Sequence, residues 1–405
     1  MIPSSSSSNR MMISIHSQRN SISRLRTNNI AEYNYYRMKK MLMLNSNCSS
    51  ILILAFCCSL IIFAQTITIV NGNNNVCGGI EKFLYCNCDN QDDVQEANCY
   101  TVGENISSSD KNWNSFGEFK SLKRLKLSGY NNFTLRQFPK ILFQTQTLRD
   151  SLHDVILSDL QFQTLPTGAF KDMSQIRLIE ISLCSRIEIQ TNTFDNLPRL
   201  EKIVMTKNNI PRLPRMFRNV PSLREIYFED NNISTFERGV FESLKNLNYL
   251  TLDNNKIHTL SSYYFDGLTE LNTLELRYNQ IKHLPSRVFE KMSKLEILDL
   301  SHNEIKDIDE GAFIGLIQLK ELQMEFNKLK YIGTQLRIMA NLIEIDLDGN
   351  ELQALSKYSF HRPDQKRFVH MKIRSKFFYH LFYLLFDSSF LTILKFNVVP
   401  VNYMK

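Results

Sequence analysis

The chain has 405 residues, of which 43% are hydrophobic and 22% are charged, with only 13 glycines and 10 prolines. This composition excludes collagen-like and wholly disordered proteins. The net charge of +7 comes from the ends, because residues 1–64 hold seven basic residues and one acidic, and residues 361–405 hold eight basic and two acidic. Residues 65–360 carry a net charge of −5, which argues against a nucleic-acid-binding protein.

Residues 38–64 have the pattern of a secretory signal peptide. Lys39 and Lys40 precede an uncharged apolar stretch that ends in the small residue Ala64, where we expect cleavage. The same stretch is long enough for a type II signal anchor with the lysines in the cytoplasm. Residues 1–37 are either a transit peptide or a disordered, over-extended start. We expect a secreted, extracellular protein, with a plasma-membrane protein as the alternative.

Four cysteines lie close together after this leader, namely Cys77, Cys86, Cys88 and Cys99. Such a set in an exported chain predicts two disulfide bonds. A zinc site is disfavoured, because C-x-x-C pairs and histidine partners are missing. A bond between Cys86 and Cys88 is geometrically poor, and more than one pairing stays open.

An L-x-x-L-x-L-x-x-N-x-L frame recurs ten times, and its first apolar positions are 122, 152, 176, 200, 223, 247, 271, 295, 319 and 342. All steps after the first are 23 or 24 residues. A second column has the same period: Phe170, Phe194, Phe217, Phe241, Phe265, Phe289, Phe313, Leu336 and Phe360. No single repeat can bury its apolar face alone, so the period predicts a solenoid in which neighbouring repeats stack.

Each repeat is expected to form one short strand whose apolar side chains point inward. The asparagine of the frame should lie inside the turn and bind backbone groups that are cut off from water. The predicted ladder is Asn208, Asn231, Asn255, Asn279, Asn303, Asn327 and Asn350. Tyr130 and Leu160 replace asparagine in the first two repeats, which predicts irregular N-terminal turns. Cys184 replaces it in the third and is expected to be a buried structural thiol.

The frame and the spacing Cys77-x8-Cys86-x-Cys88-x10-Cys99 resemble extracellular leucine-rich-repeat proteins over about residues 77–360. Members of this family include chondroadherin-like matrix proteins, Slit, Toll-type ectodomains and the non-catalytic subunit of a secreted luciferase. The resemblance implies an α/β solenoid, a right-handed horseshoe with a parallel concave sheet. It also implies a cysteine-rich N-terminal cap at 65–121, repeats at 122–360, and the pairs Cys77–Cys88 and Cys86–Cys99.

The tail, residues 361–405, departs from this family. No cysteine follows Cys184, so the family's C-terminal cysteine-rich cap is absent. Three explanations stay open for the apolar run from Phe377 to Leu394: a membrane helix, a helical plug on the last repeat, or a truncated or misread end. A membrane helix would carry Asp387 at a cost of about 3 kcal/mol.

The repeats carry no catalytic motif, and their histidines are scattered along the chain. We therefore expect neither an enzyme nor a cofactor or metal site. The sequons Asn105-Ile-Ser, Asn132-Phe-Thr and Asn232-Ile-Ser predict N-glycans on an exported chain. A binding protein for recognition or adhesion is the favoured function. The alternatives are a structural matrix protein and a non-catalytic accessory subunit of a secreted enzyme.

The outward positions of the strands in repeats five to ten predict the binding surface. Ten of these eighteen residues are acidic and one is basic. An acidic groove with aromatic anchors suits a protein partner with a basic surface. Like charges at neighbouring positions, Glu229 with Asp253 and Glu275 with Asp299, are expected to repel. The candidate partner-binding residues are Tyr227, Glu229, Tyr249, Asp253, Glu275, Arg277, Tyr278, Asp299 and Phe326.

Overall fold

The structure, a computed structural model, describes residues 77, 84–89, 93–101, 107, 109–129, 135, 137–356, 359, 369–373 and 394–396. The chain divides into two compact units, Met1–Asn73 and Asn74–Lys405, and all described residues belong to the second. The leader at 38–64, the sequons at Asn105 and Asn132, and most of the tail lie outside the described residues. The cleavage of the leader and the glycosylation of these two sequons remain predictions from the sequence.

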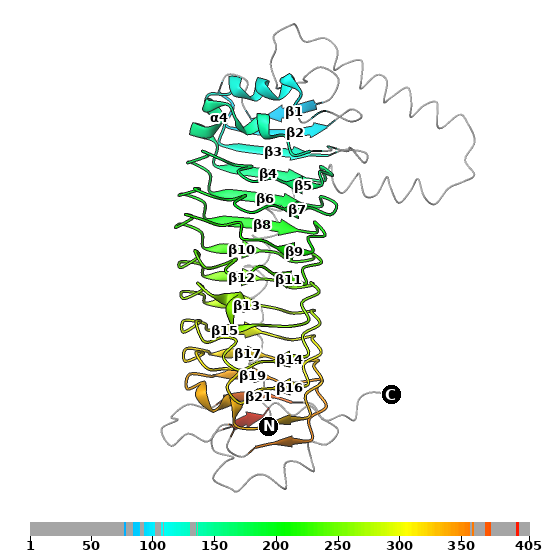
Figure 1. Cartoon of the computed structure of the whole chain (residues 1–405), viewed down its shortest axis with the longest axis vertical. Coiled ribbons are helices and arrows are strands. Elements are labelled where there is room, and N and C mark those ends of the chain that lie inside the picture. Colours follow the sequence, from blue (N-terminus) through cyan, green and yellow to red (C-terminus); the bar gives the residue numbers. More distant parts are fainter. Residues whose placement is uncertain are drawn as a thin grey trace, which may run out of the picture. The chain divides into compact units, whose positions relative to one another are not determined.

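A sheet of 14 strands forms the body of the second unit, and its strands are stacked in chain order (Figure 1). At its N-terminal edge, β1 (Leu84–Cys88) pairs antiparallel with β2 (Glu96–Thr101). All later pairs are parallel. The remaining strands are β3 (Arg124–Ser128), β4 (Asp154–Ser158), β6 (Leu178–Ser182), β8 (Lys202–Thr206), β10 (Glu225–Tyr227), β12 (Tyr249–Thr251), β13 (Thr273–Glu275), β15 (Ile297–Asp299), β17 (Glu321–Gln323), β19 (Glu344–Asp346), β21 (Val369–Lys372) and β22 (Leu394–Phe396).

Alternation along most strands divides the residues between core and surface, although the outward residues Thr251 of β12 and Asp346 of β19 are also buried. In β13, Leu274 is fully buried while Thr273 and Glu275 are partly exposed. Leu250 and Leu298 occupy the same register in the neighbouring strands and are also buried. The frame therefore fixes which side chains reach the surface of the sheet. The predicted solenoid with a parallel sheet is confirmed.

The predicted asparagine ladder is also confirmed. The Asn279 side-chain amide donates to the carbonyl oxygens of Leu252 at 2.9 Å and Leu276 at 3.1 Å, and its Oδ1 accepts the amide of Ile257 at 3.0 Å. Each ladder residue from Asn231 to Asn350 accepts a main-chain amide from the preceding repeat. The ladder thus satisfies backbone groups that have no access to water.

The phenylalanine column packs on the other side of the core. Phe170 stacks on Phe194 with ring centroids 5.9 Å apart, and Phe289 stacks on Phe313 at 6.3 Å. All four rings are fully buried. Short strands pair outside the large sheet: β5 (Thr164–Leu165) with β7 (Glu188–Ile189), β9 (Arg212–Leu213) with β11 (Thr235–Phe236), β14 (His283–Leu284) with β16 (Asp307–Ile308), and β18 (Tyr331–Ile332) with β20 (Ala354–Leu355).

Helix is scarce among the described residues. It consists of the 3-10 helices η1 (Lys111–Glu118), η2 (Lys140–Phe143), η3 (Ser262–Phe265) and η4 (Gln335–Ile338), and the α-helix α4 (Gln146–Ser151). Both η2 and α4 fall in the long first step between β3 and β4, where Arg124 still pairs with Asp154. The predicted irregularity of the first turns is therefore a helical insertion that leaves the sheet register intact.

The N-terminal edge of the sheet is closed by the cysteine-rich cap. Cys77 is bonded to Cys88, and Cys86 is bonded to Cys99, its direct partner across β1 and β2. This is the pairing that the family resemblance implied. Trp113 and Phe116 of η1 are fully buried in the same core. The cap therefore shields the first repeat from water.

The tail contributes two strands to the sheet, which the sequence analysis did not anticipate. β21 pairs parallel with β19, so that Glu344 faces His370, and β22 pairs parallel with β21. Val369 and Met371 are buried, which makes β21 a further turn of the repeat. The apolar edge left after the tenth repeat is thus covered by chain from the tail. Residues 374–393 lie outside the described part.

Candidate functional site

The strongest concentration of charge lies on the outward side of the sheet between β10 and β19. Arg277, which follows β13, lies among three carboxylates. Its Nε is 2.7 Å from Oδ2 of Asp253 and 3.6 Å from Oδ2 of Asp299, and its Nη2 is 3.6 Å from Oε2 of Glu275. Glu275 and Asp299 were expected to repel one another, but Arg277, itself a predicted site residue, contacts both and offsets their charges.

Asp253 is buried, with only 5% of its surface exposed. Besides the Nε contact, its Oδ1 accepts the main-chain amide of Arg277 at 2.7 Å. Burial raises the pKa of Asp253 to about 6, although Arg277 acts in the opposite direction. Asp253, one of the predicted partner-binding residues, thus supports Arg277 from within the surface.

Glu229 and Glu325 are half-buried carboxylates on the same face. Burial is the main cause that raises the pKa of Glu229, followed by the nearby Glu275 and Asp230. Burial also raises the pKa of Glu325, and Asp346 and Asp299 add to the effect. Oε2 of Glu325 is buried and accepts no hydrogen bond within the described part of the chain. A cation supplied by a partner would stabilise the charged form of both carboxylates.

An aromatic pair lies next to this charge. The rings of Tyr227 and Tyr249 are 4.9 Å apart, and the Tyr249 hydroxyl donates to Oε2 of Glu275 at 2.8 Å. The Nζ atom of Lys202 lies 4.1 Å from the centre of the Tyr227 ring and 3.0 Å from Oε2 of Glu225. Both tyrosines are partly exposed. Lys202 was not among the predicted residues, because the prediction covered only the strands of repeats five to ten. Lys202 occupies the same position in repeat four as Glu225 in repeat five, and this register was the available signal.

Tyr278 and Phe326, two predicted anchors, are brought together by a residue that was not predicted. The His302 ring lies between them, with centroids 4.2 Å from Tyr278 and 4.5 Å from Phe326. The three rings are nearly parallel, at 16° and 20°. Tyr278, His302 and Phe326 occupy the same position of the frame in three successive repeats, and this equal spacing was the signal for the stack.

The other predicted positions have simpler surroundings. The Asn232 side chain is partly exposed and donates to Oδ1 of Asn209. Cys184 is a buried free cysteine, and burial raises the pKa of its thiol to about 11. A thiol in this state is a poor nucleophile.

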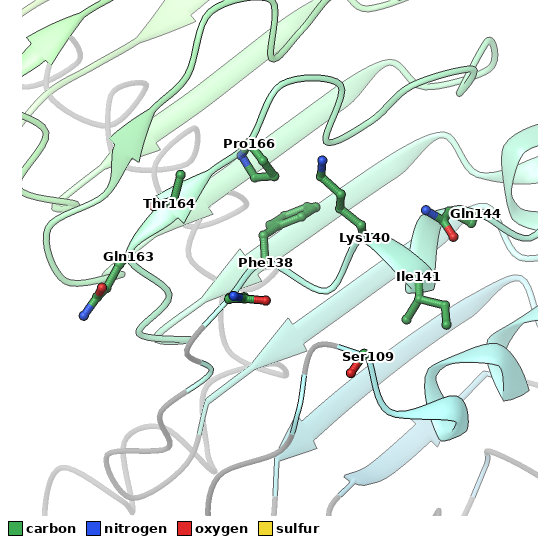
Figure 2. A pocket seen from close by; sticks show the side chains of 9 residues that line it. Ser109, Phe138, Lys140, Ile141, Gln144, Gln163, Thr164 and Pro166 are labelled. Carbon is green, nitrogen blue, oxygen red and sulfur yellow. The ribbon is translucent and has the colours of Figure 1, made fainter.

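A separate cavity of about 580 Å³ lies beside η2 and β5 (Figure 2). Phe138, Lys140, Thr164 and Pro166 line it with several amide side chains. Its lining contains no carboxylate, cysteine or histidine.

The described residues hold no group of three or more His, Cys, Asp or Glu side chains placed to bind a metal ion. Within the same described residues, no helix has the length and apolar character needed to cross a membrane.

Comparison with known proteins agrees with this fold. The family described as "Leucine rich repeat" matches residues 184–233, 221–281 and 269–329. The Oplophorus-luciferin 2-monooxygenase non-catalytic subunit of Oplophorus gracilirostris is 27% identical over 100 residues, covering 24% of this chain and 28% of that protein. Connectin of Drosophila melanogaster is 31% identical over 150 residues, covering 36% of this chain and 18% of Connectin. The chain thus matches less than a third of either relative.

Among solved structures, the TLR13–ssRNA13 complex aligns with a TM-score of 0.54 and 19% identity, covering 73% of this chain and 45% of that one. The Drosophila Toll–Spatzle complex aligns with a TM-score of 0.47 and 17% identity, covering 72% and 52%. At 19% identity, the likeness to TLR13 concerns the fold alone. Taken with the repeat frame and the stacked parallel sheet, the family match shows that residues 184–329 consist of leucine-rich repeats.

Proposed function

We propose that this protein is an extracellular recognition module without catalytic activity, which binds a protein with a basic surface on the outward face of its sheet. The observation that carries the proposal is an excess of carboxylates on that face. From Glu229 to Lys372, two cations, Arg277 and Lys372, lie among seven acidic side chains. The acidic residues are Glu229, Asp253, Glu275, Asp299, Glu325, Asp346 and Asp348.

The aromatic residues supply the anchors of this surface. Tyr227 and Tyr249 combine a large apolar area with few rotatable bonds, and such residues dominate the energy of many interfaces. The hydrogen bond from Tyr249 to Glu275 holds its ring in place before a partner arrives. A pre-organised anchor loses little conformational entropy on binding.

The same charge disfavours nucleic acid as the partner. Carboxylates on the sheet surface repel phosphates, whereas phosphate contacts with lysine and arginine supply most of the affinity of nucleic-acid-binding proteins. We propose no cofactor. Contact with a membrane belongs to the proposal only if the leader is uncleaved or the tail inserts.

Secretion is the proposed route to the extracellular space. The leader pattern of residues 38–64 supports it, and so do the two disulfides of the cap, because such bonds persist in oxidising compartments. A type II anchor at the plasma membrane would expose the same repeats. N-glycans at Asn105, Asn132 and Asn232 would accompany either route.

The test begins with affinity capture from extracellular fluid on the immobilised protein, followed by rate measurements with the identified partner. Tyr249→Ala should speed dissociation at a cost of about 2 kcal/mol. Tyr249→Phe keeps the ring and loses the hydrogen bond to Glu275, and it serves as the matched control. A folded Tyr249→Ala protein with wild-type dissociation would move the binding site off this face.

A second candidate function is supported by one comparison. The match to the non-catalytic subunit of Oplophorus-luciferin 2-monooxygenase favours an accessory subunit of a secreted enzyme. Native mass spectrometry of the secreted protein separates the candidates. A fixed complex with a catalytic chain supports the accessory subunit, and a homo-oligomer supports a structural matrix protein.

A further inference from the structure

A column of left-handed backbone follows the strands of the large sheet. The residue just before the ladder position has φ between 52° and 66° in nine successive repeats. Glycine, asparagine and aspartate adopt this conformation readily, whereas bulky side chains rarely do. The members are Asp159, Leu183, Lys207, Asp230, Asn254, Tyr278, His302, Phe326 and Gly349, of which the first eight are not glycine.

Three successive repeats place aromatic rings in this unfavourable backbone, and they form the stack of Tyr278, His302 and Phe326. Tyr278 is 50% exposed and Phe326 is 54% exposed. Strained backbone and exposed apolar rings both cost stability, and proteins keep such combinations mainly at functional sites. The stability of the fold therefore does not account for these three rings, which points to a role in binding.

Gly349 fixes one end of the stack. A Cβ atom at Gly349 would lie 2.6 Å from Cδ1 of Phe326, so the ring occupies the space that a side chain would need. The stack is thus a pre-organised apolar wall, defined here by the rings of Tyr278, His302 and Phe326. The rings cover one another on the faces that they share, and their edges line the exposed side of the wall.

Carboxylates lie directly beside this wall. Glu325 precedes Phe326 in the chain, and its Oε2 atom is buried without a hydrogen bond from the described residues. Asp299 and Asp346 are close enough to Glu325 to disfavour its charge. Arg277 lies 3.6 Å from Asp299, and Lys372 lies 3.6 Å from Asp346. The surface thus combines an apolar wall with a floor in which carboxylates outnumber these two cations.

We propose that the wall of Tyr278, His302 and Phe326 docks a lysine- or arginine-rich extended segment of the protein partner. These side chains have an aliphatic stem and a charged head, so the stem can lie along the ring edges while the head reaches Glu325 and Asp299. The proposal rests on the proposed function and adds the chemistry of the segment that is bound. Single-stranded RNA, which also uses aromatic stacks, is disfavoured because the carboxylates repel its phosphates.

The probes are two synthetic peptides of equal length and charge, oligo-lysine and oligo-diaminobutyrate. The second has shorter stems and tests the contribution of the wall. The main variant is Tyr278→Asn/His302→Asn/Phe326→Asn, because Asn254 shows that this column accommodates asparagine. The control is Leu183→Asn, which removes an exposed apolar side chain from the same left-handed column, away from the carboxylates.

Binding is measured by isothermal calorimetry on the full secreted protein. We expect oligo-lysine to bind wild type about tenfold more tightly than oligo-diaminobutyrate, since each methylene buried on the wall adds affinity. The triple variant should lose this difference and bind both peptides equally, while Leu183→Asn keeps it. Phe326→Asn alone should lose part of it, which provides a readout if the triple variant fails to fold.

Three results would overturn the docking wall: an unchanged preference for oligo-lysine in the folded triple or single variant, an equal loss in Leu183→Asn, or RNA binding that the triple variant abolishes. The proposed function is tested separately by Glu229→Gln/Glu325→Gln with the same peptides. If this double variant weakens both peptides while the wall variants change nothing, only the docking wall is wrong. If neither peptide depends on these carboxylates, the proposed function fails as well.

Discussion

Asp253 and Arg277 are joined across adjacent repeats by two hydrogen bonds of 2.7 Å, one to the guanidinium and one to the main-chain amide. Because Asp253 is buried, this pair holds the arginine in place from below. Arg277 in turn lies within 3.6 Å of Asp299 and Glu275. Arg277 therefore organises the part of the acidic surface that Asp253, Glu275 and Asp299 form.

The pH dependence of stability should reveal the burial of Asp253. Its pKa is raised from 3.8 to about 6, so the folded protein binds this proton more tightly than the unfolded chain does. The contribution of this carboxyl to the free energy of unfolding therefore falls as the pH rises from about 4 to about 6, by at most about 3 kcal/mol.

Urea unfolding of wild type and Asp253→Asn across this range gives the measurement. The stability of wild type relative to the variant should decrease with rising pH, and the difference should level off above the raised pKa. A relative stability that increases with pH would show that the attraction of Arg277 outweighs burial.

The asparagine ladder should be a major source of stability. Asn303 donates to the carbonyls of Leu276, Leu300 and Ser301 and accepts the amide of Ile281. Asn303→Ala leaves these buried groups without a partner, and we expect a loss of about 3 kcal/mol in chemical unfolding. Gln280→Ala changes an exposed residue beside the neighbouring ladder position Asn279 and should cost less than about 0.5 kcal/mol. Equal losses would contradict the ladder.

The sequence predicted the fold because the repeat frame is a local pattern with a physical meaning at each position. Apolar residues at fixed spacing must face one core, and an asparagine in the turn must satisfy the backbone. The buried Leu274 and the hydrogen bonds of Asn279 follow directly from this frame. In the tail, β21 was missed because its step from β19 is longer than the regular steps of 23 or 24 residues and no asparagine marks it.

The candidate site was predicted less completely. The frame assigns residues to the outward face, which identified Tyr249, Glu275 and Arg277, but it does not say which side chains bond to one another. Whether a carboxylate is free or engaged depends on rotamers and on the neighbouring repeat, as the burial of Asp253 shows. The place of His302 in the aromatic stack depends on backbone φ angles, which the frame leaves unspecified for such residues.

Gly349 should be required by the ring of Phe326. Gly349→Ala introduces a Cβ into a left-handed residue and into the space of the ring, and we expect a loss of about 1 to 2 kcal/mol in thermal unfolding. In a Phe326→Asn background only the backbone penalty remains, so the loss should be smaller. A double-mutant cycle with no coupling between these residues would show that the ring does not press on Gly349.

Thiol counting tests the leader and Cys184 together. In the native protein, Cys184 should not react with a thiol reagent, because the thiol is buried and its pKa is raised to about 11. Under denaturing, non-reducing conditions, a chain cleaved after Ala64 should label at one cysteine. Additional labelling at Cys48, Cys57 or Cys58 would show that the leader is retained, and rapid labelling of native Cys184 would contradict its burial.

The most direct test of the proposal that the partner binds on the acidic outward face is to measure the association rate at increasing ionic strength. The comparison uses wild type, Glu229→Gln/Glu325→Gln and Glu270→Gln, whose exposed carboxylate lies in the loop between η3 and β13. Screening acts over about 8 to 10 Å at physiological salt, so association with wild type and with the control should slow as salt is added. The double variant should associate more slowly at low salt and show a weaker salt dependence. A folded double variant that associates at the wild-type rate at every salt concentration would contradict binding on this face.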